Sequence, residues 1–212
     1  GLVGSEMCIR DRVLNGSFCE APIIKKAKEM GMYVITTGNA PNLIGHQYAD
    51  EYIPADYSDK EKVLQIVKDN DIEGVISCAN DFGVLTAAYV AEQMGWSGHD
   101  KYEIAKLLHH KNLFKQYVYK HNIPAPHSYC PEDKADALNY IKQIEYPIIV
   151  KANDLTGGKG IRRANTYEEA VEAVDYSYEK SRDKHIVIEP FVIGTQHTYC
   201  LLYTSPSPRD RT

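Results

Sequence analysis

The fold is decided by residues 146–161, which read YPIIVKANDLTGGKGI. The apolar run that ends in Lys151 predicts a buried strand, and a glycine-rich loop follows, with Gly157, Gly158, Lys159 and Gly160. Glycines adopt positive φ and let the backbone approach a ligand closely, so that N–H groups can face phosphate oxygens. A nearby lysine adds positive charge for the same anion. The pattern fits a phosphate-binding loop and, equally well, a β-hairpin with a solvated lysine.

Two common nucleotide-binding motifs are excluded. Lys159 is followed by Gly160 rather than by Ser or Thr, and Asn153 stands where a Walker A loop has its first glycine. After the first apolar run the chain reads Asn15-Gly16-Ser17 instead of GxGxxG, which disfavours a dinucleotide-dependent dehydrogenase.

Upstream of the loop, short apolar strands alternate with helices. The pattern predicts strands at 13–14, 32–37, 50–54 and 72–77. It predicts three helices: one at 20–31, one that begins at a capping box formed by Ser58 and Glu61, and one at 81–95. Asn80, which follows the fourth strand, is expected to cap the next helix rather than to face a substrate. Alternating strands and helices with short connections imply a parallel sheet covered on both faces.

The second half has a different pattern. After a boundary near 95–98 it predicts helices at 101–109, 111–121 and 132–144, and a helix that Thr166 and Glu169 cap and that ends near Lys180. The strands are expected at 146–151, 161–164 and 185–189. The fold class is therefore α/β, with a parallel sheet followed by a smaller α+β unit.

The two ends of the chain do not fit a natural protein. Reverse translation of Glu6–Asp11 as GAG ATG TGT ATA AGA GAC gives, on the opposite strand, codons for Leu201–Ser205. Two unrelated protein ends are not expected to be reverse complements of each other. We therefore interpret 1–12 and 200–212 as adapter-like sequence rather than natural tails and set them aside. The remaining 13–199 is expected to be part of a longer protein.

Composition limits the functional class. The net charge of −5 argues against a protein that binds nucleic acid through charge. No stretch reaches the roughly 18 apolar residues that a membrane span needs. Outside the two ends the cysteines are Cys19, Cys78 and Cys130, which are too widely spaced for a zinc site or a disulfide framework. Reduced thiols of this kind favour a cytoplasmic protein.

Three features around the glycine loop make the phosphate interpretation more specific. Lys111 begins an amphipathic helix before the loop, and Glu189-Pro190-Phe191-Val192 and then Gly194–His197 follow the last strand. Each has an ordinary alternative by itself, such as a surface charge or a strand-end carboxylate. In this order and spacing they resemble the ATP-grasp superfamily, in particular biotin carboxylase and the large subunit of carbamoyl-phosphate synthase.

The resemblance implies a role for each position. Lys111 and Lys151 would contact the phosphates of ATP, and the loop at 157–160 would close over them. The segment at 189–192 would hold the adenine through its backbone groups. The ribose position falls on one of two neighbours, Gln196 or His197.

The resemblance also implies a domain order and an activity. A parallel-sheet pre-ATP-grasp domain would occupy 13–96, and an incomplete ATP-grasp domain would occupy 97–199, with its lid at about 125–190. The activity would be that of an ADP-forming ligase, which uses ATP and Mg²⁺ to activate a carboxylate as an acyl phosphate for attack by an amine or another nucleophile. The family's Mg²⁺ ligands and catalytic residues lie beyond this stretch, so none is assigned here. Turnover by the 212-residue chain alone is not expected.

Two other functional classes remain open at this point. A non-catalytic nucleotide-binding or regulatory module would have the same fold. A sheet domain that binds small molecules without ATP would leave the order of Lys111, Lys151 and the glycine loop unexplained. The sequence identifies neither the carboxylate substrate nor the nucleophile, and it leaves open whether the protein forms a homodimer. Neither a nucleic acid nor a membrane is expected as a partner.

Overall fold

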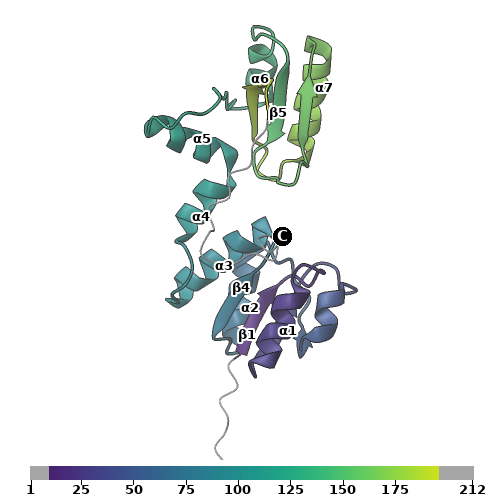
Figure 1. The fold of residues 1–212 in the computed structure, drawn as a ribbon, viewed down its shortest axis with the longest axis vertical. Coiled ribbons are helices and arrows are strands. Elements are labelled where there is room, and N and C mark those ends of the chain that lie inside the picture. Colours follow the sequence, from purple (N-terminus) through teal and green to yellow (C-terminus); the bar gives the residue numbers. More distant parts are fainter. Residues whose placement is uncertain (1–9, 196–212) are drawn as a thin grey trace, which may run out of the picture.

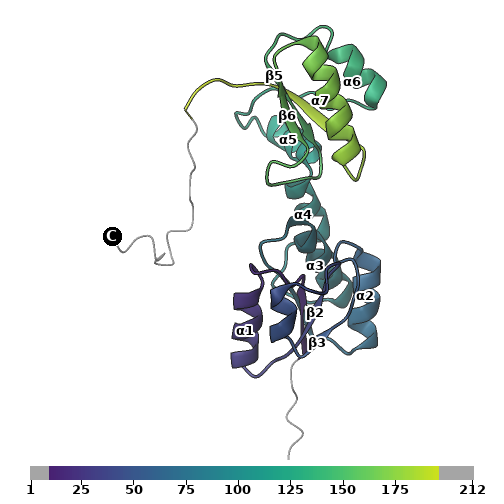
Figure 2. The same ribbon diagram turned by 90° about the vertical axis from the view of Figure 1, so that its right-hand side faces the viewer.

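A parallel sheet forms the N-terminal half of the computed structural model, which describes residues 10–195 (Figures 1 and 2). Its strands lie in the order β3-β2-β1-β4, and all pairings are parallel. The strands are β1 (Arg10–Leu14), β2 (Tyr33–Thr37), β3 (Glu51–Tyr52) and β4 (Gly74–Ser77). The helical elements between and after them are α1 (Ala21–Glu29), the 3₁₀ helix η1 (Ile44–Tyr48), α2 (Lys60–Asp69) and α3 (Asp81–Met94).

Helices cover both faces of this sheet because neighbouring apolar residues near the end of β1 and in β2 point to opposite faces. Val13 and Val34 pack with Ile24 of α1 on one face. On the other face, Leu14 and Ile35 pack with apolar residues of α2 and α3. The predicted parallel sheet with helices on both faces is confirmed.

The first strand is longer than the sequence predicts. Arg10, Asp11 and Arg12, which the sequence analysis sets aside, pair with Tyr33, Val34 and Ile35 of β2. Arg12 is completely buried on the face that packs against α2 and α3.

One helix cap was predicted wrongly and three other helix ends were predicted correctly. Asp59, not Ser58, caps α2, because its carboxylate accepts a hydrogen bond from the backbone N–H of Lys62. Ser58 instead donates to the Asp56 carboxylate. Three predicted ends are confirmed: Asn80 caps α3, Gly95 ends it with φ of 70°, and Thr166 caps the last helix.

The second half is an antiparallel sheet that two helices connect to the first sheet. The helices α4 (Tyr102–His109) and α5 (Lys111–Lys120) lie between the two sheets (Figure 1). The sheet has the order β6-β5-β7, with both pairings antiparallel. Its elements are α6 (Lys134–Tyr140), β5 (Ile148–Ala152), β6 (Ile161–Ala164), α7 (Tyr167–Lys180) and β7 (Ile186–Pro190).

The core of this second unit lies on one face of its sheet. Ile148 and Val150 of β5 and Ile186 and Ile188 of β7 pack against α6 and α7. The helix predicted at 132–144 is shorter than expected: the Asp133 side chain caps its start by accepting from the N–H of Asp136, and it ends at Tyr140. Within the described range, no helix has the length and apolar character that crossing a membrane requires.

Candidate functional site

Strand register brings Lys151 and Glu189 together on the face of the second sheet opposite its core. Glu189 of β7 pairs with Ile149 of β5, and Lys151 lies two residues further along β5. Because side chains alternate along a strand, Ile149, Lys151 and Glu189 share one face. Figure 1 shows α5 and α7 on opposite sides of β5, so this face turns toward α5.

Glu189 is the centre of a buried charge cluster. Its side chain is 5% exposed, and Oε2 lies 2.5 Å from Nζ of Lys151. Its Oε1 lies 2.8 Å from Nζ of Lys115 and accepts a hydrogen bond of 2.5 Å from Oγ of Ser128. Burial by itself would raise the pKa of Glu189, but the hydrogen bonds from Lys115, Lys151 and Ser128 outweigh it and lower the pKa. The carboxylate is therefore ionised and fully engaged.

The ammonium group of Lys111 is held by the chain that leads into the glycine loop. Nζ donates to the carbonyl oxygens of Ala152 at 2.9 Å, Asn153 at 3.4 Å and Leu155 at 2.5 Å. These carbonyls occupy all three donors of the ammonium group. Burial and then the charge of Lys151 lower the pKa of Lys111. In this arrangement Lys111 fixes the start of the loop.

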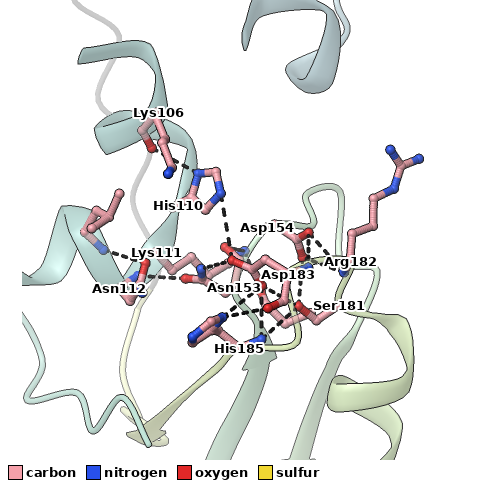
Figure 3. A network of polar contacts seen from close by, with 12 residues as sticks. Lys106, His110, Lys111, Asn112, Asn153, Asp154, Ser181, Arg182, Asp183 and His185 are labelled. Atoms are coloured by element: carbon pink, nitrogen blue, oxygen red, sulfur yellow. Dashed lines mark hydrogen bonds and ion pairs between the residues drawn. The ribbon is translucent and has the colours of Figure 1, made fainter. Parts of the chain in front are cut away.

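Asn153 supplies the cap that α5 lacks in its own sequence. No side chain at His110 caps this helix, and the Asn153 amide oxygen instead accepts from the N–H of Asn112 at 2.8 Å. The Asn153 amide nitrogen donates to Asp183 at 2.6 Å. One buried asparagine thus connects α5, the end of β5 and the segment before β7 (Figure 3).

Two carboxylates hold the segment between α7 and β7 in place. Asp154 is 3% exposed and accepts from Oγ of Ser181 and from the N–H groups of Arg182 and Asp183. Asp183 accepts from Oγ of Ser181 and from the N–H of His185 (Figure 3). Burial alone would raise the pKa of Asp183, but hydrogen bonds from Asn153, Ser181 and His185 lower it. These contacts make the base of the glycine loop rigid.

The glycine loop connects the antiparallel strands β5 and β6 and is mostly exposed. Gly157, Gly158 and Gly160 have φ values of 63°, 77° and 67°, which side-chain-bearing residues rarely adopt. Lys159 lies among them and is exposed. The Lys159 N–H donates to the carbonyl of Thr156 at 3.3 Å, and the Lys159 side chain is exposed beside the three glycines.

Gly160 should tolerate substitution less well than Gly158. A Cβ at Gly160 would lie 2.6 Å from Cβ of Ala152, whereas a Cβ at Gly158 would meet nothing within 4 Å. Both changes to alanine incur the strain of positive φ, but only Gly160→Ala adds an overlap inside the structure. We expect Gly160→Ala to lower the free energy of unfolding by about 1–3 kcal/mol more than Gly158→Ala in urea titrations. Equal losses would contradict the close packing of Gly160.

Two arginines of β6 point to opposite faces of the sheet. Arg162 lies over the ring of Tyr176 on α7 at 4.0 Å, on the core side. Arg163 lies 4.3 Å over the ring of Phe191, which comes directly after β7. Arg163 pairs with Ile149 across the sheet, so it shares the face of Lys151 and Glu189.

The segment expected to hold adenine, 189–192, lies at the end of β7 and directly after it. Pro190 ends β7, and the N–H of Phe191 donates to the carbonyl of Pro147 at 2.9 Å. Val192 is 66% exposed. Gln196 and His197, the two ribose candidates, lie outside the described residues.

The glycine loop also contacts the first sheet unit. Thr156 donates to the carboxylate of Asp81 in the first turn of α3. Arg182 donates to Oγ of Ser58 at 2.9 Å and lies 4.1 Å over the ring of Phe82. A cavity of about 590 Å³ lies between the two units here, lined by residues that include Asn80, Lys159 and Arg182.

Sequence reasoning missed two members of the Glu189 cluster, Lys115 and Ser128. Lys115 follows Lys111 by four residues, a spacing that places both on one face of a helix. That spacing could have indicated Lys115. Ser128 has no such signal, because it lies in an irregular segment between α5 and α6.

The residues that the structure describes do not form a magnesium site. Within 10–195, no group of three or more His, Cys, Asp or Glu side chains could hold a metal ion. The Asp154 and Asp183 carboxylates are engaged by N–H and O–H donors. We therefore derive no step through a metal ion.

The sequence is similar to an ATP-grasp domain family, to a phosphoribosylamine–glycine ligase and to a carbamoyl phosphate synthase large chain. Residues 109–206 match the family model described as phosphoribosylglycinamide synthetase, ATP-grasp (A) domain. The chloroplastic phosphoribosylamine–glycine ligase of Arabidopsis thaliana is 27% identical over 176 residues, which are 80% of this chain and 31% of the relative. The carbamoyl phosphate synthase large chain of Campylobacter jejuni is 23% identical over 201 residues, 91% of this chain and 18% of the relative.

The fold is similar to that of solved ATP-grasp enzymes. A biotin carboxylase domain from Hydrogenobacter thermophilus, solved with MgADP, ADP and bicarbonate, superposes with a TM-score of 0.67 at 20% identity. The match covers 87% of this chain and 44% of that one. The resemblance is confirmed for both named relatives, and the family model adds a branch that the sequence analysis did not name. The chain spans less than half the length of the relatives it matches.

Proposed function

Because the chain is related to the ATP-grasp superfamily, we propose that the face of the second sheet around Lys151, with the glycine loop, holds the phosphates of ATP. The observation that carries the proposal is the position of Lys151. Its ammonium group lies at the end of β5, where the loop begins, and its side chain is 24% exposed although it contacts a buried carboxylate. The loop beside it offers N–H groups from residues with positive φ.

In the longer protein, we propose that this site serves a ligase that converts a carboxylate to an acyl phosphate for attack by an amine or another nucleophile. A triphosphate and a carboxylate repel each other, by roughly 4 kcal/mol for unit charges at 4 Å and an effective dielectric of 20. Cations must offset this repulsion as the two groups approach. A closing loop must also exclude water, because an acyl phosphate hydrolyses readily.

Lys111 and Lys159 have different roles in this proposal. Lys159 is exposed in the loop and reaches the phosphates as the loop closes. Lys111 is bound to three carbonyl oxygens, so it contributes its charge to the site while it anchors the start of the loop. The segment at 189–192 receives the adenine through its backbone, and Gln196 or His197 receives the ribose.

The proposal predicts that Lys151→Met weakens binding of ATP at least about tenfold, because one charge-assisted contact to a phosphate is removed. Isothermal titration calorimetry on the full 212-residue chain measures the change. The matched control is Lys134→Met, on α6 behind the core, where the exposed lysine pairs with Asp175. This control should leave the affinity unchanged.

Equal ATP affinities of the wild type and Lys151→Met would contradict the proposed site. Binding of ATP through Lys151 without turnover would be consistent with two functions. One is a ligase whose catalytic residues lie outside this chain, and the other is a non-catalytic regulatory module. Acidic metal ligands in the remainder of the full-length protein distinguish the two, since a ligase requires them.

A further inference from the structure

We propose that Lys115 sets the charge that Lys151 offers to a nucleotide, by neutralising the carboxylate of Glu189 from the other side. The inference rests on the proposed function, since it adds a residue to the same phosphate site. Neither the sequence pattern nor the family resemblance assigns a role to Lys115. It acts through Glu189, so it is a positioning residue rather than a group that touches the nucleotide.

The geometry divides the two oxygens of Glu189 between the two lysines. Lys151 approaches Oε2 at 2.5 Å, and Lys115 approaches Oε1 at 2.8 Å. Ser128 fixes Oε1 further with its hydroxyl group. The carboxylate is nearly excluded from solvent, so water cannot readily replace either ammonium group.

Lys111 and Arg163 add positive charge to this region from outside the Glu189 cluster, and within the cluster the balance depends on both of its lysines. Lys151 and Glu189 by themselves sum to zero, and a neutral pair attracts a phosphate weakly. Lys115 brings the sum to one positive charge, and the partly buried position keeps solvent from screening it fully. Of the two lysines, Lys151 is the more exposed, at 24% against 14%. The net charge is therefore available at Lys151.

Lys111 makes no direct contact with Glu189 among the described residues, although its charge lies in the same region. Its ammonium group donates to the carbonyls of Ala152, Asn153 and Leu155, whereas Lys115, one helical turn later, reaches the carboxylate. Lys115 also lies 3.4 Å from the carbonyl oxygen of Pro126, which orients its side chain toward the sheet. Lys111 and Lys115 thus have separate partners.

The test compares binding of ATP and of adenosine, which has no phosphate, by calorimetry on the full chain. Lys115→Met should weaken ATP binding about tenfold, which corresponds to about 1.4 kcal/mol, and leave adenosine binding unchanged. Adding Glu189→Gln to Lys115→Met should restore ATP affinity to about the wild-type value, because no carboxylate is left to neutralise. Lys115→Arg should bind ATP like the wild type, and so should Lys120→Met, which removes an exposed lysine from the same helix.

A structural role alone would give a different pattern. If Lys115→Met weakens adenosine as much as ATP, or if Glu189→Gln fails to rescue it, Lys115 acts through packing and the inference is wrong. Should Lys115→Met unfold, Lys115→Gln makes the same comparison, because it keeps a hydrogen-bond donor without the charge. A wild type that binds no ATP contradicts the proposed function as well, whereas Lys151-dependent binding that is insensitive to Lys115 contradicts this inference alone.

Discussion

Arg12→Met is expected to raise the melting temperature. Arg12 is 0% exposed in the central strand β1, and its three guanidinium nitrogens have no hydrogen-bond partner among the residues 10–195. Burial lowers the pKa of Arg12 to about 10, although the charge of Glu51 acts in the opposite direction. Burying a cation without a partner lowers the stability of the folded state. Methionine is an unbranched side chain that can occupy much of the same space without a charge.

The expected gain in unfolding free energy is about 2–4 kcal/mol, and the melting temperature should rise by about 5–10 °C in calorimetry. Arg162→Met is the matched control, because Arg162 is an exposed strand arginine. That change should cost no more than about 1 kcal/mol, the contribution of an exposed cation–π contact such as that with Tyr176. A lower melting temperature for Arg12→Met would show that the guanidinium group has a stabilising partner and would contradict this account.

Asp154→Ala is expected to destabilise the base of the glycine loop. It removes the acceptor for the N–H groups of Arg182 and Asp183 in the segment before β7, whereas the hydroxyl of Ser181 keeps Asp183 as an acceptor. Hydrogen bonds to a charged acceptor contribute about 1.5–3 kcal/mol each, and water can compensate for some of this loss, so we expect a cost of about 3 kcal/mol. Urea titrations followed by circular dichroism measure it.

The control for this change is Asp175→Ala. Asp175 pairs with Lys134 on the surface, with side chains 54% and 51% exposed. Exposed ion pairs contribute about 0–1 kcal/mol, so this alanine should have little effect. If both substitutions had the same small cost, Asp154 would not hold the loop base. Amide hydrogen exchange at 181–185 gives an independent measure, because Asp154→Ala should accelerate exchange there.

Local sequence patterns predicted most of the elements. The periodicity of α3 and the cap of α7 depend on residues within one or two turns, so Asn80, Gly95 and Thr166 could be assigned from spacing alone. Ser58 and Asp59 are both good caps, and spacing does not decide between neighbours. At α2 the Asp59 carboxylate reaches the N–H of Lys62, whereas Ser58 turns to Asp56.

The candidate site was only partly predictable. Lys151, Glu189 and the glycine loop were singled out by their order along the chain. The contact of Lys115 with Glu189 depends on how α5 packs against the sheet. The cap that Asn153 gives to α5 joins two segments that lie about forty residues apart in the sequence. The burial of Arg12 was not anticipated, because 1–12 had been set aside.

The central claim is that the phosphates of ATP bind at Lys151 and the glycine loop. The most direct test is a titration of the ¹⁵N-labelled chain with a non-hydrolysable ATP analogue, followed by amide chemical shifts. The account predicts that the largest changes occur at Lys151, at 157–160 and at 191–192, and that Lys151→Met abolishes them. A separate cavity of about 360 Å³ lies between α1 and β4, lined in part by Met30 and Trp96. Shifts confined to that cavity, with the loop unchanged, would contradict the account.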